Sequence, residues 1–411
     1  MFVIKKNLTF KKFFSTTNIL LKKFNNINIC DNKKGIQLEN QDGEIIKIPL
    51  IWLRDHCKSE KSYTWKTFQK NVILNDLWKQ SEINNNSDIK FDKENQKIFI
   101  KWKDGHKSEY DIKSILKSNT YKNNQIPEKI LWNKKLFISN SKPLSYNNLD
   151  VREFYKEFFK YGLVFINDVP YHDSKYTKEL CEKIACIQNT LFGSFWVFSN
   201  SSTNKDEVHA DTAYTSTSIG LHTDGTYFQQ TPGIQVLHCL QKSKSGGENI
   251  LTDGFYCAQN LNKKYPTYYK FLSNNKFYHH YKELPSDNTS TGYHSVNYSN
   301  IIETSNDEIK QIRFNPYDRM DITIGRSEED YNNLMIFYQS YTKFNEILND
   351  EDNTLEISLN PGTVMFMDNK RILHARKEFE GKRIMCGAYL NYDDMVARAN
   401  SLFEGNKIEY L

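Results

Sequence analysis

The sequence is short of the features that mark membrane, fibrous and disulfide-rich proteins. No apolar run approaches the ~18–20 residues that span a bilayer, and no internal repeat, coiled-coil heptad or Pro-rich segment is present. The seven cysteines are scattered and form no set of close pairs that would indicate a disulfide framework. We therefore expect a globular protein that does not enter a membrane and that works in a reducing compartment.

The start of the chain lacks acidic side chains, since the first carboxylate is Asp31. Residues 1–24 hold six lysines, an apolar set around Phe13 and Phe14, and the hydroxyl run at residues 15–17. A basic, hydroxylated and acid-free start is typical of a mitochondrial transit peptide, which we predict over residues 1–26. The stretch also lacks arginine, which departs from the usual pattern and leaves a disordered basic tail as the alternative.

Without this start the chain carries little net charge. The full sequence has a formal net charge of +5, and removal of the six lysines would leave −1. A nearly neutral protein lacks the electrostatic footprint of nucleic-acid binding, so we expect no nucleic-acid partner.

The length is sufficient for two domains, at ~100–200 residues for each hydrophobic core. Residues 27–135 predict a small β-rich N-terminal domain. Within it, residues 43–49, 98–102 and 107–110 alternate as strands do, and a hairpin turn is expected at residues 104–105.

Residues 136–411 predict a larger second domain. Short strands dominate from Leu221 onward, and a long polar helix is expected among them at residues 328–348. Helices are also expected at residues 149–159 and 176–190. Many short strands with flanking helices favour a mainly β jelly roll, or double-stranded β-helix, which can carry a metal in its barrel.

One group of residues has the chemistry of a metal site: His222, Asp224 and, far downstream, His374. Residues i and i+2 of a strand point to the same face, so His222 and Asp224 can reach one ion. We expect His374 near the start of a neighbouring strand that follows a buried strand at residues 363–369. Two imidazoles and one carboxylate are the ligands of a facial-triad Fe(II) site, which leaves positions open for a co-substrate and dioxygen.

The His-x-Asp spacing alone is weak, because His209 and Asp211 show it as well. In a chain with ten histidines and 50 acidic residues, such triplets arise by chance. The distant His374 and the sequence around residues 222–224 favour that pair over the earlier one.

Several ordered motifs surround these residues. They are LHTDGTYF at 221–228, PGIQVLHCL at 232–240, GG at 246–247, DGFY at 253–256, RFNPYDR at 313–319 and DNKRILH at 368–374, with DTAYT at 211–215 before them and IWLRDHC at 51–57 and WKDGH at 102–106 near the start. Together they resemble the family of γ-butyrobetaine and trimethyllysine dioxygenases, from about residue 45 to the C-terminus.

The resemblance implies a double-stranded β-helix enzyme of the mitochondrial matrix that uses Fe(II), 2-oxoglutarate and dioxygen, with ascorbate as reductant. It implies that His222, Asp224 and His374 bind the metal and leaves His209 as a loop residue. It also implies a small-molecule substrate in carnitine biosynthesis. The N-terminal domain could serve as a homodimerisation module, as in relatives.

Arg383 and Asn249 are predicted to contact 2-oxoglutarate. Arg383 follows His374 by nine residues, where the family places the arginine that holds the far carboxylate of the co-substrate. A guanidinium grips a carboxylate through two parallel hydrogen bonds. Asn249 stands where relatives carry a hydroxyl residue, and an amide can also donate a hydrogen bond. A surface arginine on a strand is the alternative for Arg383.

Aromatic side chains are predicted around the substrate's trimethylammonium group, because this cation has no N–H to donate and is held by ring faces. The residues that match the family's aromatic cage are Phe192, Trp196, Tyr214 and Tyr389. Core packing is the alternative for each ring, since the chain is rich in aromatic residues.

The other end of the substrate separates the two activities of the family. Asp211 would pair with the α-ammonium group of trimethyllysine, whereas it would repel the carboxylate of γ-butyrobetaine. Asn315 and Arg319 are further candidates for this end, with Arg319 suited to a carboxylate. Their alternatives are a turn asparagine and a capping arginine.

We therefore expect hydroxylation of N6,N6,N6-trimethyl-lysine at C3, the first step of carnitine biosynthesis. Hydroxylation of γ-butyrobetaine, the last step, is the alternative. A non-catalytic protein that binds quaternary ammonium groups is the alternative from a different class.

The N-terminal domain departs from its relatives at a zinc site of three cysteines and one histidine. Cys57 and His106 match two of those positions, but Ser62 stands where a cysteine is expected. Two ligands do not close a tetrahedral structural site, so we expect no zinc and a small buried apolar role for Cys57.

Overall fold

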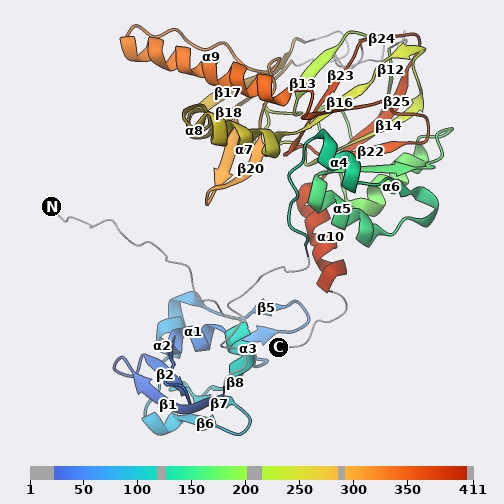
Figure 1. Cartoon of the computed structure of the whole chain (residues 1–411). Coiled ribbons are helices and arrows are strands. Elements are labelled where there is room, and N and C mark those ends of the chain that lie inside the picture. The colour runs from blue at the N-terminus through green and yellow to red at the C-terminus, as the bar shows by residue number, and fades with distance from the viewer. Residues whose placement is uncertain (1–22, 118–125, 201–214, 286–291, 405–411) are drawn as a thin grey trace. The chain divides into compact units, whose positions relative to one another are not determined.

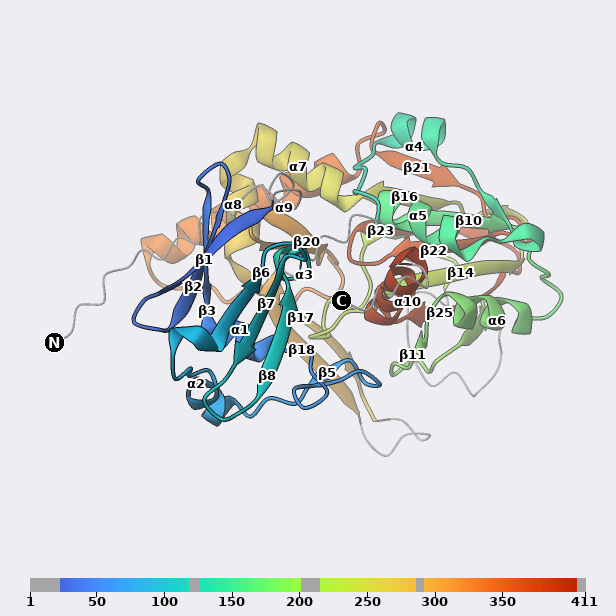
Figure 2. The same ribbon diagram turned by 90° about the horizontal axis from the view of Figure 1, so that it is seen from below.

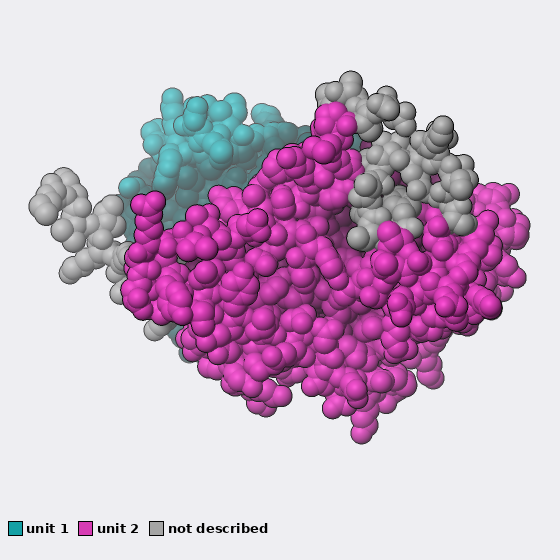
Figure 3. All heavy atoms as spheres, turned by 90° about the horizontal axis from the view of Figure 1, so that it is seen from above, with its two compact units in different colours: residues 1–122, 409–411 teal, residues 123–408 magenta. Residues whose placement is uncertain are grey.

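The computed structural model describes residues 23–117, 126–200, 215–285 and 292–404. The chain divides into two compact units, residues 1–122 with 409–411 (unit 1) and residues 123–408 (unit 2), which Figure 3 colours separately. The predicted domain boundary at residue 135 falls inside unit 2. No helix in the described ranges combines the length and the apolar character that a bilayer crossing requires.

Unit 1 consists mostly of strands. Its elements are β1 (Phe24–Cys30), β2 (Gly35–Asn40), β3 (Ile45–Pro49), α1 (Leu50–Asp55), β4 (Tyr63–Thr64), β5 (Gln69–Lys70), α2 (Leu77–Gln80), β6 (Ile89–Asp92), β7 (Lys97–Lys101), β8 (Lys107–Asp111) and α3 (Ile112–Lys117). The order β1-β2-β3 forms one antiparallel sheet and β6-β7-β8 a second one. The strands predicted at residues 43–49, 98–102 and 107–110 correspond to β3, β7 and β8. Residues 1–22 of the predicted transit peptide lie outside the described residues.

The core of unit 1 follows from strand alternation. In β7, Ile98 and Ile100 are buried and pack with Trp102, whereas the residues between them point outward. The indole Nε1 of Trp102 donates to Ser108 Oγ at 2.7 Å, so its single polar atom is satisfied inside the core.

Unit 2 is built on a large sheet. Its strands are β9 (Leu144–Ser145), β10 (Leu163–Asn167), β11 (Ile187–Gln188), β12 (Trp196–Ser199), β14 (Ile234–Gln241), β22 (Val364–Asp368) and β25 (Ile384–Leu390). The order is β11-β25-β14-β22-β10-β9, and β12 also pairs with β25. All neighbours are antiparallel except β9 and β10.

A smaller antiparallel sheet carries the motifs of chemical interest. Its strands are β13 (Ile219–His222), β16 (Asn249–Asp253), β21 (Thr354–Ile357) and β23 (Ile372–Arg376), in the order β13-β23-β16-β21. The core between the two sheets includes Leu163 and Phe165 of β10 together with Leu251 and Leu355 of the small sheet. Because both faces of β10 are covered, its sequence is a continuous apolar run.

Helices cover the outer face of the large sheet. Val164 and Ile166 of β10 pack there against Phe154 and Phe158. The helices are α5 (Val151–Tyr161), α6 (Lys175–Ile184) and α10 (Tyr392–Glu404), with α4 (Lys134–Asn140) ahead of them in sequence (Figures 1 and 2). Strands at residues 363–369 and after residue 371 were predicted correctly, and the helix predicted at 149–159 corresponds to α5.

A long insertion follows β16 and packs beside the small sheet. It consists of α7 (Gly254–Lys264), α8 (Pro266–Asn274), β17 (Lys276–Glu283), β18 (Tyr293–Asn300), β19 (Ile302–Ser305), β20 (Glu308–Ile312) and α9 (Glu328–Leu348). Two short strands, β15 (Ser245–Gly246) and β24 (Phe379–Glu380), pair nearby. The predicted helix at 328–348 is confirmed, and the Ser327–Asp330 capping box fixes where it begins.

Two secondary-structure predictions were incomplete. The helix expected at residues 176–190 is present as α6 but ends at Ile184, because the chain extends at Ala185 and enters β11. Strands outnumber helices after Leu221 as expected, but the helices α7 and α8 at residues 254–274 were not predicted. Asp253 caps α7 through hydrogen bonds from the amides of Phe255 and Tyr256.

Candidate active site

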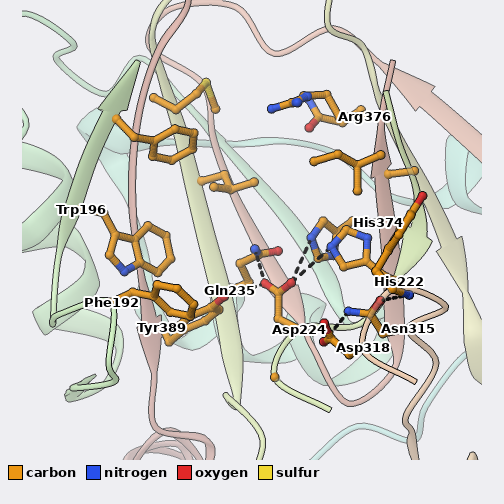
Figure 4. A pocket seen from close by; sticks show the side chains of 18 of the residues that line it. Phe192, Trp196, His222, Asp224, Gln235, Asn315, Asp318, His374, Arg376 and Tyr389 are labelled. Carbon is orange, nitrogen blue, oxygen red and sulfur yellow. Dashed lines mark hydrogen bonds and ion pairs between the residues drawn. The ribbon is translucent and has the colours of Figure 1, made fainter. Parts of the chain in front are cut away.

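The two strands β13 and β23 bring the predicted metal ligands together. They pair antiparallel with His222 directly opposite His374, and the two imidazole centroids lie 4.2 Å apart. Asp224 Oδ1 lies 3.3 Å from His222 Nε2 and 3.6 Å from His374 Nε2 (Figure 4). One donor atom from each of the three side chains falls within 4.8 Å of the others.

The turn after β13 places Asp224. Gly225 has φ +63°, and a Cβ there would stand 2.6 Å from Pro232 Cδ, so glycine is required on both counts. Asn369, in the turn between β22 and β23, accepts from the Asp224 amide at 2.8 Å and donates to its carbonyl at 3.0 Å. The turn that precedes His374 therefore also fixes the backbone of the carboxylate ligand.

Each of two ligands is oriented by a hydrogen bond on its far side. His222 Nδ1 lies 2.8 Å from the Gly220 carbonyl, so Nδ1 carries the proton and Nε2 faces the cluster. Asp224 Oδ2 accepts from Tyr389 Oη at 2.8 Å and from Gln235 Nε2. These two donors leave Oδ1 as the carboxylate oxygen that faces the imidazoles.

The charges of the cluster suit a cation. Burial opposes ionisation of Asp224, but the adjacent His374 and His222 outweigh it and lower the pKa of Asp224 to about 2. Burial, together with the positive charge of His222, lowers the pKa of His374 to about 4. Burial also disfavours a charged His222, yet the hydrogen bond and charge of Asp224 raise the pKa of His222.

The donor set fits Fe(II). Two imidazole nitrogens and one ionised carboxylate oxygen on one side of an ion constitute the facial triad of non-haem iron oxygenases. In the described part of the chain, this is the one group of three or more His, Cys, Asp and Glu side chains gathered closely enough to hold a metal.

The cluster opens into a cavity of about 300 Å³. Arg383 lines this cavity, and no carboxylate of the described residues forms an ion pair with its guanidinium. Burial lowers the pKa of Arg383, but an arginine stays charged in proteins. A largely buried cation in a cavity is suited to a carboxylate ligand such as the one predicted for it.

Arg376 is a second cationic lining residue, which sequence reasoning missed. It follows His374 by two residues on β23, so alternation sends both side chains to the cavity face. Its Nη2 donates to the carbonyls of Thr215 at 2.6 Å and Thr217 at 2.8 Å. The spacing from His374 was the signal that could have identified it.

Asn249 lies opposite Arg376 in the pairing of β16 with β23 and lines the same cavity. Its amide nitrogen is buried and has no hydrogen-bond partner among the described residues. An orphaned donor beside two arginines fits a ligand with oxygen acceptors.

Aromatic rings form the wall opposite the small sheet. Trp196 and Tyr389 meet edge to face with centroids 4.9 Å apart, and Phe192 lies beside them (Figure 4). Tyr281 and Tyr227, which were not predicted, extend this wall. The ring centroids of Phe192 and Tyr281 lie 5.7 Å apart, and those of Tyr227 and Tyr281 lie 5.0 Å apart. Tyr227 belongs to the motif of the metal ligands, whereas Tyr281 arrives from β17 and gave no sequence signal.

Gly387 makes room for the aromatic wall. It pairs with Trp196 across β25 and β12, and a Cβ at this position would stand 2.7 Å from the indole. A side chain here would push the indole toward the cavity.

The remaining predicted residues have different positions. Asn315 lines the cavity, but its amide nitrogen donates to Asp318 and its oxygen accepts from the Tyr317 amide. Arg319 is absent from the lining, and its guanidinium lies 5.4 Å from the ring centroid of Phe337 in α9. The structure therefore places Arg319 against α9 and not in the cavity lining. Asp211, Tyr214 and His209 lie outside the described residues.

Comparisons with known proteins agree with this geometry. The family model described as "Taurine catabolism dioxygenase TauD, TfdA family" matches residues 126–389, which include all the cavity residues discussed above. A second model, "Gamma-butyrobetaine hydroxylase-like, N-terminal", matches residues 27–115. The chain belongs to the TauD, TfdA family of dioxygenases.

Individual relatives narrow the comparison to trimethyllysine dioxygenases. The protein named "Trimethyllysine dioxygenase, mitochondrial" from Mus musculus is 33% identical over 371 residues, which cover 88% of this chain and 84% of the relative. The one from Homo sapiens is 32% identical, with 87% and 83% covered. "Trimethyllysine dioxygenase" from Meyerozyma guilliermondii is 32% identical, with 91% and 94% covered. The resemblance expected from the sequence motifs is confirmed, and the protein is a dioxygenase.

Proposed function

We propose that this protein hydroxylates N6,N6,N6-trimethyl-lysine at C3 in a reaction that uses Fe(II), 2-oxoglutarate and dioxygen. The observation that carries the proposal is the convergence of His222, Asp224 and His374 between two arginines and an aromatic wall. The relatives named trimethyllysine dioxygenase support the choice of substrate.

The metal and the 2-oxoglutarate co-substrate would supply the oxidising chemistry, since no side chain of the protein can do so. His222, Asp224 and His374 would hold the metal. Arg383 would bind the far carboxylate of 2-oxoglutarate, with Asn249 as a further donor and Arg376 beside them. These residues would fix the orientation of the co-substrate.

The aromatic wall would bind the trimethylammonium group. Phe192, Trp196 and Tyr389 present ring faces and edges at the end of the cavity away from Arg376 (Figure 4). A quaternary ammonium cannot donate a hydrogen bond, so contacts with ring faces are its best protein environment. Tyr214 is a fourth cage candidate. Holding this end fixes which carbon of the chain faces the metal.

Several finer points belong to the same proposal. We place the protein in the mitochondrial matrix, with residues 1–26 as the transit peptide. We assign residues 27–135 to the N-terminal domain and 136–411 to the catalytic domain, whose two sheets we interpret as a double-stranded β-helix. Ascorbate is proposed as the reductant that keeps the iron ferrous, and a homodimer as the assembly.

The experiment measures substrate-dependent succinate release from 2-oxoglutarate by the iron-loaded protein. Trimethyllysine should be preferred over γ-butyrobetaine, and mass spectrometry should place the new hydroxyl on C3. The variant His209→Ala should release succinate as wild type does, because His209 belongs to the competing His-x-Asp triplet and is not one of the proposed metal ligands. Preference for γ-butyrobetaine would refute the substrate assignment. Binding of trimethyllysine without 2-oxoglutarate consumption would favour the non-catalytic alternative.

A further inference from the structure

Asp318 is a charged cavity residue for which the proposed reaction has so far given no role. It lies in the loop between β20 and α9 and lines the cavity together with the metal ligands (Figure 4). Among the described lining residues, Asp224 is the other carboxylate, and it is assigned to the metal. A second carboxylate that lines this cavity is positioned to bind a cationic ligand.

The Asp318 carboxylate is held in place by its surroundings. Asn315 Nδ2 donates to Asp318 Oδ2 at 2.7 Å, and Thr226 Oγ1 donates to the same oxygen at 3.3 Å. The Asp318 carbonyl accepts from the His280 amide at 2.7 Å, which ties the loop to β17. Asn315 is fixed in turn by the Tyr317 amide. The carboxylate is therefore preorganised before any ligand arrives.

The co-substrate is not a suitable ligand for Asp318. 2-Oxoglutarate carries two carboxylates, which Asp318 would repel, whereas Arg376 and Arg383 attract them. Figure 4 shows Arg376 and Asp318 on opposite sides of the metal ligands. A ligand that Asp318 binds in this cavity would therefore be a cation, on the side of the metal ligands away from Arg376.

Trimethyllysine carries a cation at this point of its chain. Its α-ammonium nitrogen is bonded to C2, next to the reacting C3, so the nitrogen stays about 2.5 Å from C3, the span of two ~1.5 Å bonds. With the trimethylammonium in the aromatic cage and C3 facing the metal, the α-ammonium must lie near the metal ligands and away from the cage. Figure 4 shows Phe192 and Trp196 on one side of Asp224 and Asp318 on the other.

We propose that Asp318 binds the α-ammonium group of the substrate and thereby selects trimethyllysine against γ-butyrobetaine. The inference rests on the proposed function. Both substrates carry a carboxylate on C2, but trimethyllysine carries an α-ammonium there as well and can turn this cation toward Asp318. γ-Butyrobetaine presents the carboxylate alone, which Asp318 would repel. Asp211, to which the sequence assigned the same role, is tested separately below.

The experiment compares wild type with Asp318→Asn on trimethyllysine, on its analogue without the α-amino group and on γ-butyrobetaine. Asparagine keeps the shape and can still accept from Thr226. For trimethyllysine, KM and Kd should rise by about 10- to 100-fold, as expected for loss of one charged hydrogen bond. The deaminated analogue and γ-butyrobetaine, which carry a carboxylate but no α-ammonium, should both bind equally well or better. Kd is measured with Mn(II) in place of Fe(II), so binding is read without turnover.

Two controls make the result specific. Asp318→Glu should recover part of the affinity for trimethyllysine, and Asp321→Asn, which alters an exposed carboxylate in the same loop, should have no effect. An equal loss for all three compounds would overturn the proposal, because a structural role does not depend on the α-amino group. A selective loss in Asp211→Asn with none in Asp318→Asn would overturn it too. If wild type consumed no 2-oxoglutarate with any compound, the proposed function would fail first.

Discussion

Unit 1 and unit 2 each bring a histidine together with short polar side chains, and the two clusters differ in charge. In unit 1, His106 Nε2 lies 3.4 Å from Cys57 Sγ, 3.2 Å from Ser59 Oγ and 3.4 Å from Ser62 Oγ. Ser108 Oγ donates to Cys57 Sγ at 3.0 Å. Burial works against a charged thiol, yet the hydrogen bonds from Ser108 and Ser59 lower the pKa of Cys57. The sequence had indicated Ser62 alone as a residue of this cluster, but the hydroxyl of Ser59 also lies beside His106 Nε2.

The cluster in unit 2 gathers a comparable number of atoms around a full negative charge. Asp224 is ionised, and Tyr389 and Gln235 bind the oxygen that the imidazoles do not face. In unit 1 the side chains beside His106 and Cys57 include two uncharged hydroxyls, whereas structural zinc sites take charge from thiolates. Convergence of side chains is therefore common to both clusters, and ligand charge is what separates a metal site from a hydrogen-bonded cluster.

Removal of the charge in unit 2 should have the largest effect. Asp224→Asn keeps the size of the side chain but gives up the anionic ligand, so iron binding and 2-oxoglutarate turnover should fall by at least about 1,000-fold, beyond the ~10–100-fold typical of outer residues. Iron content and succinate release measure the loss. Cys57→Ser in unit 1 is the counterpart and should retain both. Normal iron content in Asp224→Asn would contradict the assignment.

Addition of thiol ligands, which bind zinc as charged thiolates, to the cluster in unit 1 should have the next largest effect on metal binding. Ser59→Cys combined with Ser62→Cys would place three thiols around His106, the Cys₃His set of structural zinc sites. We expect one equivalent of zinc in unit 1 and, at a thousand-fold excess over Kd, a gain of about 4 kcal/mol in the free energy of unfolding. Co(II) absorption from thiolate ligands distinguishes this site from the one in unit 2.

The single variant Ser59→Cys is the control, since two thiols and one imidazole leave the tetrahedron incomplete. It should bind zinc much more weakly than the double variant. If the double variant bound no zinc, the serine positions would not be equivalent to ligand positions, and the comparison of the two clusters would not hold.

The sequence was sufficient to predict those candidate site residues whose positions depend on local strand and turn geometry. His222 is the last residue of β13, and Asp224 follows it in the next turn. The antiparallel pairing of β13 with β23 then brings His374 opposite His222. The sequence was insufficient to predict the cavity residues that come from the insertion after β16. Tyr281 and Asp318 reach the cavity from β17 and from the loop after β20, and no local period encodes that approach.

The same reasoning explains why Arg319, a predicted substrate contact, does not line the cavity. Arg319 has the right chemistry for a substrate carboxylate and stands one position after Asp318. A change of one residue in a loop is sufficient to turn a side chain from the cavity to the rings of α9, where Arg319 lies. Residue type does not reveal the loop conformation, which decides that Asp318 and not Arg319 lines the cavity.

A smaller effect on iron binding is expected when Asp224 keeps its charge but loses the hydrogen bond from Tyr389. Tyr389→Phe keeps the ring beside Trp196 and deletes the hydroxyl that donates to Asp224 Oδ2. Loss of an outer hydrogen bond of this kind should weaken iron binding by about 10–100-fold. Competition with a chelator measures the iron Kd without turnover.

Trp196→Phe is the matched control for Tyr389→Phe. Both variants alter the cage by a modest change in an aromatic residue, but Trp196 has no hydrogen bond to a metal ligand, so its variant should change the Kd of trimethyllysine and leave that of iron unchanged. Equal effects of the two variants on iron would contradict the role of the hydroxyl.

The comparison extends to a histidine, His238, that has no carboxylate partner in the part of the chain that the structure describes. His238, in β14, is fully buried and contacts Thr177 Oγ1 at 2.7 Å through Nδ1. Burial lowers the pKa of His238 to about 4, whereas Asp224 raises that of His222. The unfolded chain takes up a proton at His238 below pH ~6.5 and the folded chain does not, so stability is lost as the pH falls from ~6.5 toward ~4.

Replacement of His238 should therefore reduce the dependence of stability on pH. Between pH 7.5 and 5.5, His238→Gln should lose about 1.4 kcal/mol less than wild type, the value of one pKa unit. Equilibrium urea unfolding at the two pH values measures the difference, and His172→Gln, at an exposed position, should behave as wild type. An unchanged pH dependence in His238→Gln would mean that the imidazole is charged in the folded protein. In that case burial without a carboxylate would not keep a histidine neutral, and the contrast with His222 would need another cause.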